Sequence, residues 1–499
     1  MHRKPLSYAD HAWLRMDDPH NLMVITGLMT FDAPLDYERL KDTVEHSLFP
    51  FKRFRQRMVQ PKLPFKRPYW EEDPSYNLEA HLQRFILPPP HDQKTLQVLI
   101  SLLMSRELDY SRPLWQFYLV ENYESGSALI ARFHHSIGDG IALMQVLLSL
   151  TEPAPDHPPA SHPQATAQRG DYPPNEPIQT LKSTTIKPTQ RGAKGLMEEG
   201  KKMLLDPSHA VDRARQAIDF AGAVGKLALR WPDPQTVFKG PLGKEKRAAW
   251  SEPLELRDVK YIGKTLNATV NDVLVTALAG ALGRYVDFRG KTAEDLNIRS
   301  FIPVNLRPVA LDEDLGNKFG LVFLSLPLGI KDPVERLRKV KQNMDELKSS
   351  AEAVATFGIL NLLGAVPPWI EEIAVAFFDT KGTTIMTNVP GPRSQLYMAG
   401  APINMLMAWV PQSGRISLGV SILSYNGKVW LGVSTDQGLI PDPETIVSMF
   451  YHEYKEMISR AQKTRAERQE RMQPMLAMLD EAMQTLDELL AESGEDQVD

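Results

Sequence analysis

The chain of 499 residues contains no cysteine. This absence excludes disulfide bonds, zinc sites built on thiolates and a cysteinyl acyl-enzyme, and it fits a reducing compartment. Long hydrophobic runs are also missing, since no stretch reaches the roughly 20 uncharged apolar residues that span a bilayer. Residues 1–20 carry several charges and no apolar core run, so a secretory signal is not expected. Any contact with a membrane would therefore be peripheral.

An excess of positive charge is lacking too. The chain has 57 Lys and Arg against 62 Asp and Glu, for a formal net charge of -5. This balance argues against a nucleic-acid partner, which would favour a basic face. Hydrophobic residues at 42% and charged residues at 24% are ordinary for a globular protein. The length predicts two domains or more.

Proline marks the clearest internal boundary. Residues 151–195 are rich in proline and poor in apolar side chains, which predicts a linker between two halves. We therefore expect a first half over 1–150, a second half over 196–461, and an acidic helical tail over 462–499. The tail has a weak apolar face, which is compatible with packing on the body, binding a partner or lipid surface, or remaining solvated.

Periodicity predicts mixed helices and strands in both halves. Helices are expected over 35–48, 93–108, 141–150, 196–231, 269–287, 333–348 and 442–461. Strands are expected over 22–31, 115–122, 127–133, 297–304, 321–327, 383–388, 416–425 and 428–435, with a hairpin turn at Asn426-Gly427. The apolar segment 357–378 is interrupted by Pro367 and Pro368, which predicts interfacial or cavity-lining helices. Without regular βαβ alternation, the fold class is α+β.

Two adjacent histidines end the strand over 127–133 and are followed by a glycine-rich turn, His134-His135-Ser136-Ile137-Gly138-Asp139-Gly140. A strand projects neighbouring side chains to opposite faces, so one of the two histidines faces a given cavity. An imidazole titrates near neutrality and suits removal of a proton from a hydroxyl. Structural histidines, a metal site lacking a third ligand, and a loop without chemistry remain alternatives.

An ordered set of motifs carries a resemblance. The histidine segment matches the HHxxxDG motif of the chloramphenicol acetyltransferase-like and condensation-domain superfamily. Further segments resemble those of the bacterial wax ester synthase/acyl-CoA:diacylglycerol acyltransferase family. They are Pro5-Leu6-Ser7-Tyr8-Ala9-Asp10, Pro113-Leu114-Trp115, Asn271-Asp272-Val273-Leu274, Ile302-Pro303-Val304-Asn305-Leu306-Arg307, Gly316-Asn317 and Thr387-Asn388-Val389-Pro390-Gly391-Pro392. Together they cover residues 5–461.

The resemblance implies two chloramphenicol acetyltransferase-like αβ sandwich halves with an active-site tunnel between them. It makes His135 the general base and His134 its support. Asp139 is expected to be structural, with Arg307 as its partner, and Gly140 is expected to leave room beside the base. Direct transfer from acyl-CoA needs no acyl-enzyme, no metal and no further cofactor.

Four more residues are candidates for the site through the resemblance or through local pattern. The roles of Asn271 remain open: it polarises the thioester carbonyl or holds the shape of the site, or it caps the helix that begins there. Asn388, Pro390 and Gly391 form a turn that the resemblance makes part of the substrate-binding pocket.

The expected activity is transfer of a fatty acyl group from acyl-CoA to a long-chain fatty alcohol, to diacylglycerol, or to both. A condensation-type enzyme that forms an amide or ester is one alternative. The other is a non-catalytic protein that binds a lipid surface or droplet. The resemblance and the missing signal together predict a cytoplasmic protein, peripheral to the inner membrane or to lipid inclusions.

Overall fold

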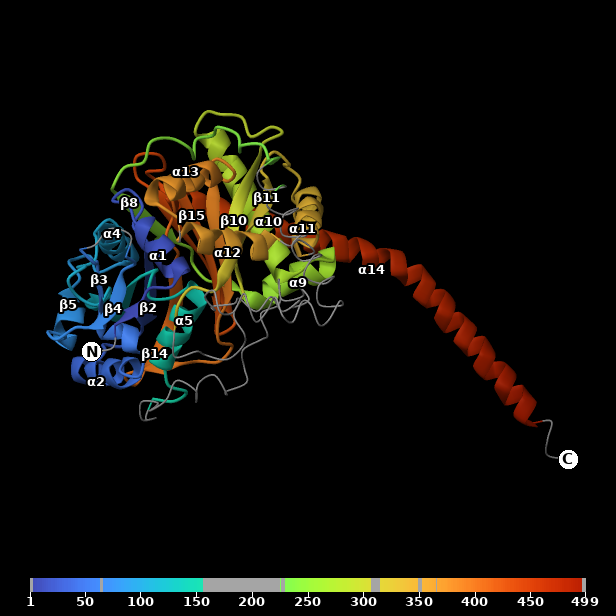
Figure 1. Cartoon of the computed structure of the whole chain (residues 1–499). Helices are drawn as coiled ribbons and strands as arrows, with labels where there is room; N and C mark the ends of the chain where they lie inside the picture. Colours follow the sequence, from blue (N-terminus) through green and yellow to red (C-terminus); the bar gives the residue numbers. More distant parts are fainter. Residues whose placement is uncertain are drawn as a thin grey trace, which may run out of the picture.

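The computed structural model describes residues 3–62, 66–155, 225, 229–306, 315–348, 352–364 and 366–495. Most of the predicted linker, most of the predicted helix over 196–231, and Arg307 lie outside these residues. The described part is an α+β fold in which helices pack on two large sheets (Figure 1).

The first large sheet has six strands in the order β13-β14-β2-β7-β6-β5. Its strands are β2 (Val24–Phe31), β5 (Leu82–Ile86), β6 (Trp115–Tyr123), β7 (Gly126–His134), β13 (Tyr397–Met398) and β14 (Ala401–Trp409). β7 pairs with β2 on one side and β6 on the other, and every one of its residues is buried. A near-continuous apolar sequence is expected of such a strand, because both of its faces are covered.

Short helices and a small sheet accompany this first sheet. The helices are α1 (Tyr8–Arg15), α2 (Tyr37–Leu48), the single-turn η1 (Lys52–Phe54), α3 (Leu78–His81), α4 (Gln93–Met104) and α5 (Gly140–Ser149). The small sheet has the order β1-β4-β3, with β1 (Lys4–Pro5), β3 (Gln56–Val59) and β4 (Tyr69–Glu72).

The second large sheet has seven strands in the order β11-β10-β12-β15-β16-β8, with β9 beside β16. Its strands are β8 (Lys246–Trp250), β9 (Leu254–Glu255), β10 (Asn297–Asn305), β11 (Phe319–Pro327), β12 (Thr384–Pro390), β15 (Leu418–Tyr425) and β16 (Lys428–Asp436). The β15–β16 hairpin turns at Asn426 and Gly427, both with positive φ. The predicted Asn-Gly turn is therefore confirmed, because these two residue types adopt this backbone conformation readily.

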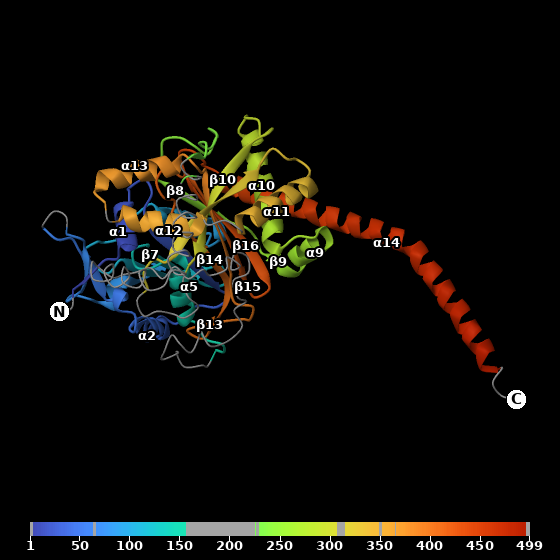
Figure 2. The same ribbon diagram turned by 45° about the vertical axis from the view of Figure 1, so that its right-hand side comes forward.

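Helices of the second half pack on this sheet and on one another. They are α9 (Leu256–Leu266), α10 (Val270–Phe288), α11 (Pro333–Lys348), α12 (Glu352–Leu363), α13 (Pro368–Asp379) and α14 (Pro443–Glu495). The segment predicted as interrupted helices over 357–378 is divided between α12 and α13. α14 unites the predicted helix over 442–461 with the tail, and its distal part extends away from the body in both views (Figures 1 and 2).

Two strands, β13 and β14, belong to the second half by sequence but to the first sheet by pairing. β14 follows β12 in the sequence, yet it pairs antiparallel with β2, so that Trp409 lies opposite Thr26. The sequence boundaries place residues 401–409 in the second half, whereas their hydrogen bonds belong to the sheet of the first half. This exchange ties the two sheets together at the edge where β14 also contacts β15 and β16.

Within the described ranges, no single helix has the length and apolar composition needed to cross a membrane. The consecutive helices α9 and α10 reach that composition only as a pair, and their axes bend by 95°. Most of α10 is buried against the second sheet and α14.

Candidate active site

His135 lies at the point where β7 ends. The last pair of the β2–β7 ladder joins Val24 and His134, and the backbone N–H of His135 then donates to the Met23 carbonyl at 2.7 Å. Asp139 ends the turn as the N-cap of α5. A rigid strand and a rigid helix therefore hold the loop that carries the imidazole.

The His135 side chain is enclosed by aromatic rings and is only 5% exposed. The Trp13 ring stacks on it with centroids 4.3 Å apart, and the Phe319 ring lies at 5.5 Å. Burial lowers the pKa of His135 to about 4, although the nearby Asp139 carboxylate acts in the opposite direction. The imidazole is therefore neutral at pH 7, which is the state that can accept a proton.

The Nδ1 atom of His135 is buried and has no hydrogen-bond partner among the described residues. A buried polar atom without a partner is costly, and most buried side-chain polar atoms have one. This unsatisfied nitrogen distinguishes His135 from a histidine that merely caps a strand.

The His134 side chain projects to the opposite face of the strand from His135, and both of its ring nitrogens have hydrogen-bond partners. Its Nδ1 lies 2.8 Å from the Ser136 hydroxyl, and its Nε2 lies 3.2 Å from the Tyr110 hydroxyl and 3.7 Å from an Asp17 carboxylate oxygen. Burial alone would raise the pKa of Asp17, but hydrogen bonds with His134 and Tyr110 outweigh it, and the pKa is lowered. His134 therefore belongs to a buried polar network that fixes the strand end.

A buried ion pair between Arg53 and Asp10 supports the loop that carries His135. The Arg53 guanidinium donates to the backbone carbonyls of Ser136 and Ile137, both at 2.9 Å. Its other terminal nitrogen donates to the Asp10 carboxylate at 3.0 Å, and Asp10 is fully buried. Because Arg53 binds backbone oxygens of the motif itself, this ion pair determines the path of the loop.

Asn317 connects the same loop to the second half. Its Nδ2 donates to the Asp10 carboxylate and to the His135 carbonyl, both at 2.8 Å. Its backbone N–H also donates to Asp10, at 3.1 Å. Asn317 lies between a Gly138–Gly316 backbone bridge and the start of β11. The two halves therefore meet at the backbone of the histidine motif.

Asp139 has a helix-capping and a bridging contact. Its Oδ1 accepts from the backbone N–H of Ala142 at 2.9 Å, and its Oδ2 accepts from that of Lys318 at 3.0 Å. These contacts fix the turn and join α5 to the second half. Arg307, the partner expected for Asp139, lies outside the described residues.

The glycines of the motif differ in their surroundings. A Cβ on Gly138 would lie 3.3 Å from the Leu315 side chain, so this position is packed. A Cβ on Gly140 would meet no atom within 4 Å. Space is therefore open beside Gly140, at the first residue of α5.

Asn271 does not cap α10. The N-cap is Thr269, whose side chain accepts from the Asp272 N–H, while the Asp272 side chain accepts from the Thr269 N–H. The capping role considered for Asn271 is therefore wrong, because a complete capping box already occupies the helix start. Instead, Asn271 Oδ1 accepts from Asn388 Nδ2 at 2.6 Å. Two of the predicted site residues are thus in direct contact.

The turn after Asn388 is shaped by close backbone approach. Pro390 lies opposite Ser424 in the β12–β15 ladder, and the Gly391 N–H donates to the Ser424 carbonyl at 2.8 Å. A Cβ on Gly391 would lie 2.2 Å from that carbonyl, so only glycine fits.

Sheet topology relates this turn to His135. β10 and β12 run parallel, and β11 runs antiparallel to β10. The carboxyl ends of β10 and β12 therefore lie at the edge where β11 begins with Phe319. The Asn271–Asn388 pair and the Phe319–His135 contact accordingly occupy the same end of the second sheet.

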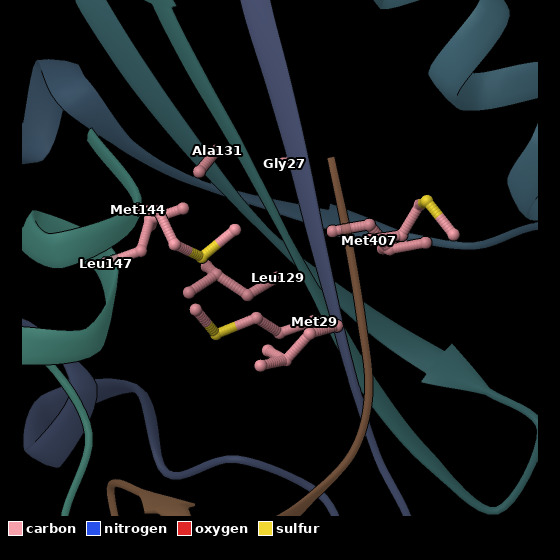
Figure 3. A pocket seen from close by; sticks show the side chains of 9 residues that line it. Gly27, Met29, Leu129, Ala131, Met144, Leu147 and Met407 are labelled. Atoms are coloured by element: carbon pink, nitrogen blue, oxygen red, sulfur yellow. The ribbon is translucent and has the colours of Figure 1, made fainter. Parts of the chain in front are cut away.

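A small apolar cavity lies between the first sheet and α5, the helix that follows the motif (Figure 3). Its volume is about 10 Å³, close to that of a single water-sized sphere. Methionines from three elements line it, namely Met29, Met144 and Met407. Methionine side chains are flexible, so this space is deformable.

Sequence reasoning missed Trp13, Arg53 and Phe319, which carry much of the geometry around His135. Asp10 and Asn317 lie in motifs that resemble family segments, but no role followed from the sequence. Arg53 has no local signature at all. Among the described residues, no group of three or more His, Asp or Glu side chains could hold a metal ion.

Comparisons of the chain with protein-family models and with known proteins point to the same family. Residues 6–274 match the model of the wax ester synthase/diacylglycerol acyltransferase catalytic domain, and residues 315–458 match that of the WS/DGAT C-terminal domain. A putative diacylglycerol O-acyltransferase of Mycobacterium tuberculosis is 26% identical, over 91% of this chain and 90% of its own length. A probable diacylglycerol O-acyltransferase of the same species is 25% identical, over 88% and 92%.

Solved structures show the same fold. The wax ester synthase/diacylglycerol acyltransferase from Marinobacter aquaeolei matches with a TM-score of 0.65 and 20% identity, over 92% of this chain and 99% of its own. The first condensation domain of the calcium-dependent antibiotic synthetase matches with a TM-score of 0.56 and 14% identity, over 92% and 96%.

Proposed function

The chain belongs to the wax ester synthase/diacylglycerol acyltransferase family and is an acyltransferase, and we propose that His135 is the general base of its reaction. The observation that carries this proposal is the buried, neutral imidazole with an unpartnered Nδ1 at the end of β7. A neutral histidine can take a proton from a hydroxyl that enters the site.

The proposed reaction is a direct transfer from acyl-CoA. The acceptor hydroxyl oxygen attacks the thioester carbonyl carbon while His135 takes the hydroxyl proton. The carbon–sulfur bond then breaks, and the imidazolium returns the proton to the departing coenzyme A thiolate. One ester forms and one thiol is released, so protons and electrons balance without an acyl-enzyme or another cofactor.

Trp13 and the Asp10–Arg53–Asn317 contacts are proposed as positioning groups. Stacking limits rotation of the His135 ring, and the hydrogen bonds fix its backbone. Asn271 is proposed to donate from Nδ2 to the thioester oxygen, because its Oδ1 is occupied by Asn388. Loss of a donor of this kind costs about 3 kcal/mol of transition-state stabilisation.

The proposed acceptors are diacylglycerol and long-chain fatty alcohols. The names of the mycobacterial relatives favour diacylglycerol, and the name of the Marinobacter protein includes both activities. Because these acceptors are insoluble in water, we place the enzyme in the cytoplasm, at the surface of the inner membrane or of lipid inclusions.

The test is coenzyme A release from palmitoyl-CoA with hexadecanol, with dioleoylglycerol and without acceptor. Direct transfer predicts release only when an acceptor is present, and the faster acceptor ranks the two activities. A burst of release without acceptor, equal to the enzyme concentration, would instead indicate an acyl-enzyme. No release with either acceptor would overturn the proposed substrates.

A condensation-type reaction is less favoured, because both family models are those of the acyltransferases. A condensation-type enzyme would require an acyl donor bound to a carrier protein. Turnover of free palmitoyl-CoA would therefore argue against a condensation-type reaction. A purely lipid-binding protein would bind the acceptors and release no coenzyme A.

A further inference from the structure

α13 exposes apolar side chains to solvent and buries Glu371, while the neighbouring Glu372 is exposed. Trp369, Ile373 and Phe377 follow one another at intervals of four residues and are 61%, 63% and 40% exposed. Side chains at this spacing share one face of a helix. Glu371, by contrast, is buried and pairs with Arg15 of α1. Since surface helices usually bury their apolar side, this exposed stripe suggests a partner.

A second exposed apolar segment lies beside the end of this helix. Leu229 and Trp231 are each 84% exposed. They flank Arg230, whose backbone carbonyl accepts from the Lys381 ammonium group. That ammonium group lies 4.2 Å over the Phe377 ring. Leu229, Trp231, Trp369, Ile373 and Phe377 together are called the α13 patch.

Cationic side chains surround the carboxyl end of α13. Arg230 and Arg299 act electrostatically on Lys381, which is itself buried, and Arg415 and Lys239 act on Asp379, the last residue of the helix. The cationic rim therefore consists of Arg230, Lys239, Arg299 and Arg415, of which Arg299 is also paired with Asp233. Burial raises the pKa of Asp379 to about 7, so this carboxyl group offsets less of the positive charge. An apolar stripe with a cationic rim complements a layer of anionic head groups over acyl chains.

We propose that the α13 patch seats the enzyme on the surface of a phospholipid layer with anionic head groups. Trp369, Ile373 and Phe377 enter the boundary between head groups and acyl chains, and the cationic rim meets the phosphates. Aromatic residues, and tryptophan in particular, are favoured at that depth. α13 lies on the outside of the body in both views, so no other element has to move (Figures 1 and 2).

A single helix, α1, contacts both α13 and the proposed catalytic histidine, His135. Arg15 of α1 donates to the carbonyl of Leu363, the last residue of α12, and to that of Val366 in the α12–α13 connection, and it also pairs with Glu371. Two residues earlier in α1, Trp13 stacks on His135. Docking through α13 therefore brings the lipid surface close to the site. The functional reason for docking rests on the proposed lipid acceptor, whereas the binding of the α13 patch to a phospholipid layer does not depend on it.

The test is co-sedimentation of the full chain with vesicles of phosphatidylcholine and phosphatidylglycerol. Trp369→Ser combined with Ile373→Ser is expected to weaken binding about tenfold or more, since two apolar side chains leave the lipid. The matched control is Phe49→Ser with Ile86→Ser, two side chains that are 57% and 66% exposed, directly after α2 and at the end of β5. The control should bind as the wild type does.

Two further measurements separate this inference from the proposed chemistry. His135→Ala should bind vesicles normally, and the Trp369/Ile373 variant should release coenzyme A normally with a short-chain alcohol in solution. Equal vesicle binding by this variant and the wild type would overturn the docking surface. So would a wild-type dimer in light scattering that this variant converts to a monomer, because the patch would then face a second copy.

Discussion

The enclosure of His135 predicts an unusually low acid limit for catalysis. The pKa of its imidazole falls from the ordinary value of 6.5 to about 4, chiefly through burial among Trp13 and Phe319. The acid limb of kcat/KM reports the pKa of the essential base in the free enzyme. We therefore expect the limb for acyl-CoA near pH 4. A limb near pH 6.5, with protein that recovers fully at pH 7, would refute the enclosed base.

The same shift predicts a change in stability. Between pH 6.5 and 4 the unfolded chain binds a proton at this histidine and the folded chain does not, so the free energy of unfolding decreases as the pH falls. A shift of about 2.5 units corresponds to about 3 kcal/mol. Denaturant unfolding of wild type and His135→Gln should therefore differ by about 3 kcal/mol more at pH 7 than at pH 4, in favour of the wild type. A difference that is independent of pH would contradict the assigned cause.

Three substitutions test the surroundings of the base. Asp10→Asn should lower the free energy of unfolding by about 3 kcal/mol, because it leaves the buried Arg53 without its counter-ion, and denaturant unfolding measures this. Trp13→Leu should decrease kcat with little change in KM and move the acid limb towards pH 6.5, since it opens the ring to water. Asn271→Ala should decrease kcat about a hundredfold, and adding Asn388→Ala should cost little more, because the second residue acts through the first. Additive losses in this double variant would show that the two amides act independently.

The local sequence pattern was sufficient to predict those elements of the fold whose structure is determined by neighbouring residues in the chain. The apolar run of β7, the helical period of α4 and the Asn426-Gly427 turn each specify their own structure, and the observed elements agree with them. The motif after β7 identified His135 because two histidines at a strand end followed by a glycine-rich turn form an uncommon arrangement. Its burial and its stacked neighbours were not predictable from the motif.

What the sequence did not reveal depends on contacts between distant residues. β14 has no local feature that names β2 as its partner, so its transfer to the other sheet was not anticipated. Arg53 is one basic residue among many, and only its three-dimensional position gives it a role. At α10 the sequence offered Asn271 as a cap, but the reciprocal bonds of Thr269 and Asp272 close the helix start instead. Asn271 is therefore not needed as a helix cap, and its side chain contacts Asn388 instead.

The most direct test of the central claim is the kcat of His135→Ala with palmitoyl-CoA and dioleoylglycerol, measured beside the wild type after circular dichroism has shown the same fold. Removal of the general base should decrease kcat by about a hundredfold or more. Turnover within a few-fold of the wild type would contradict the account, because the proton would then have another acceptor.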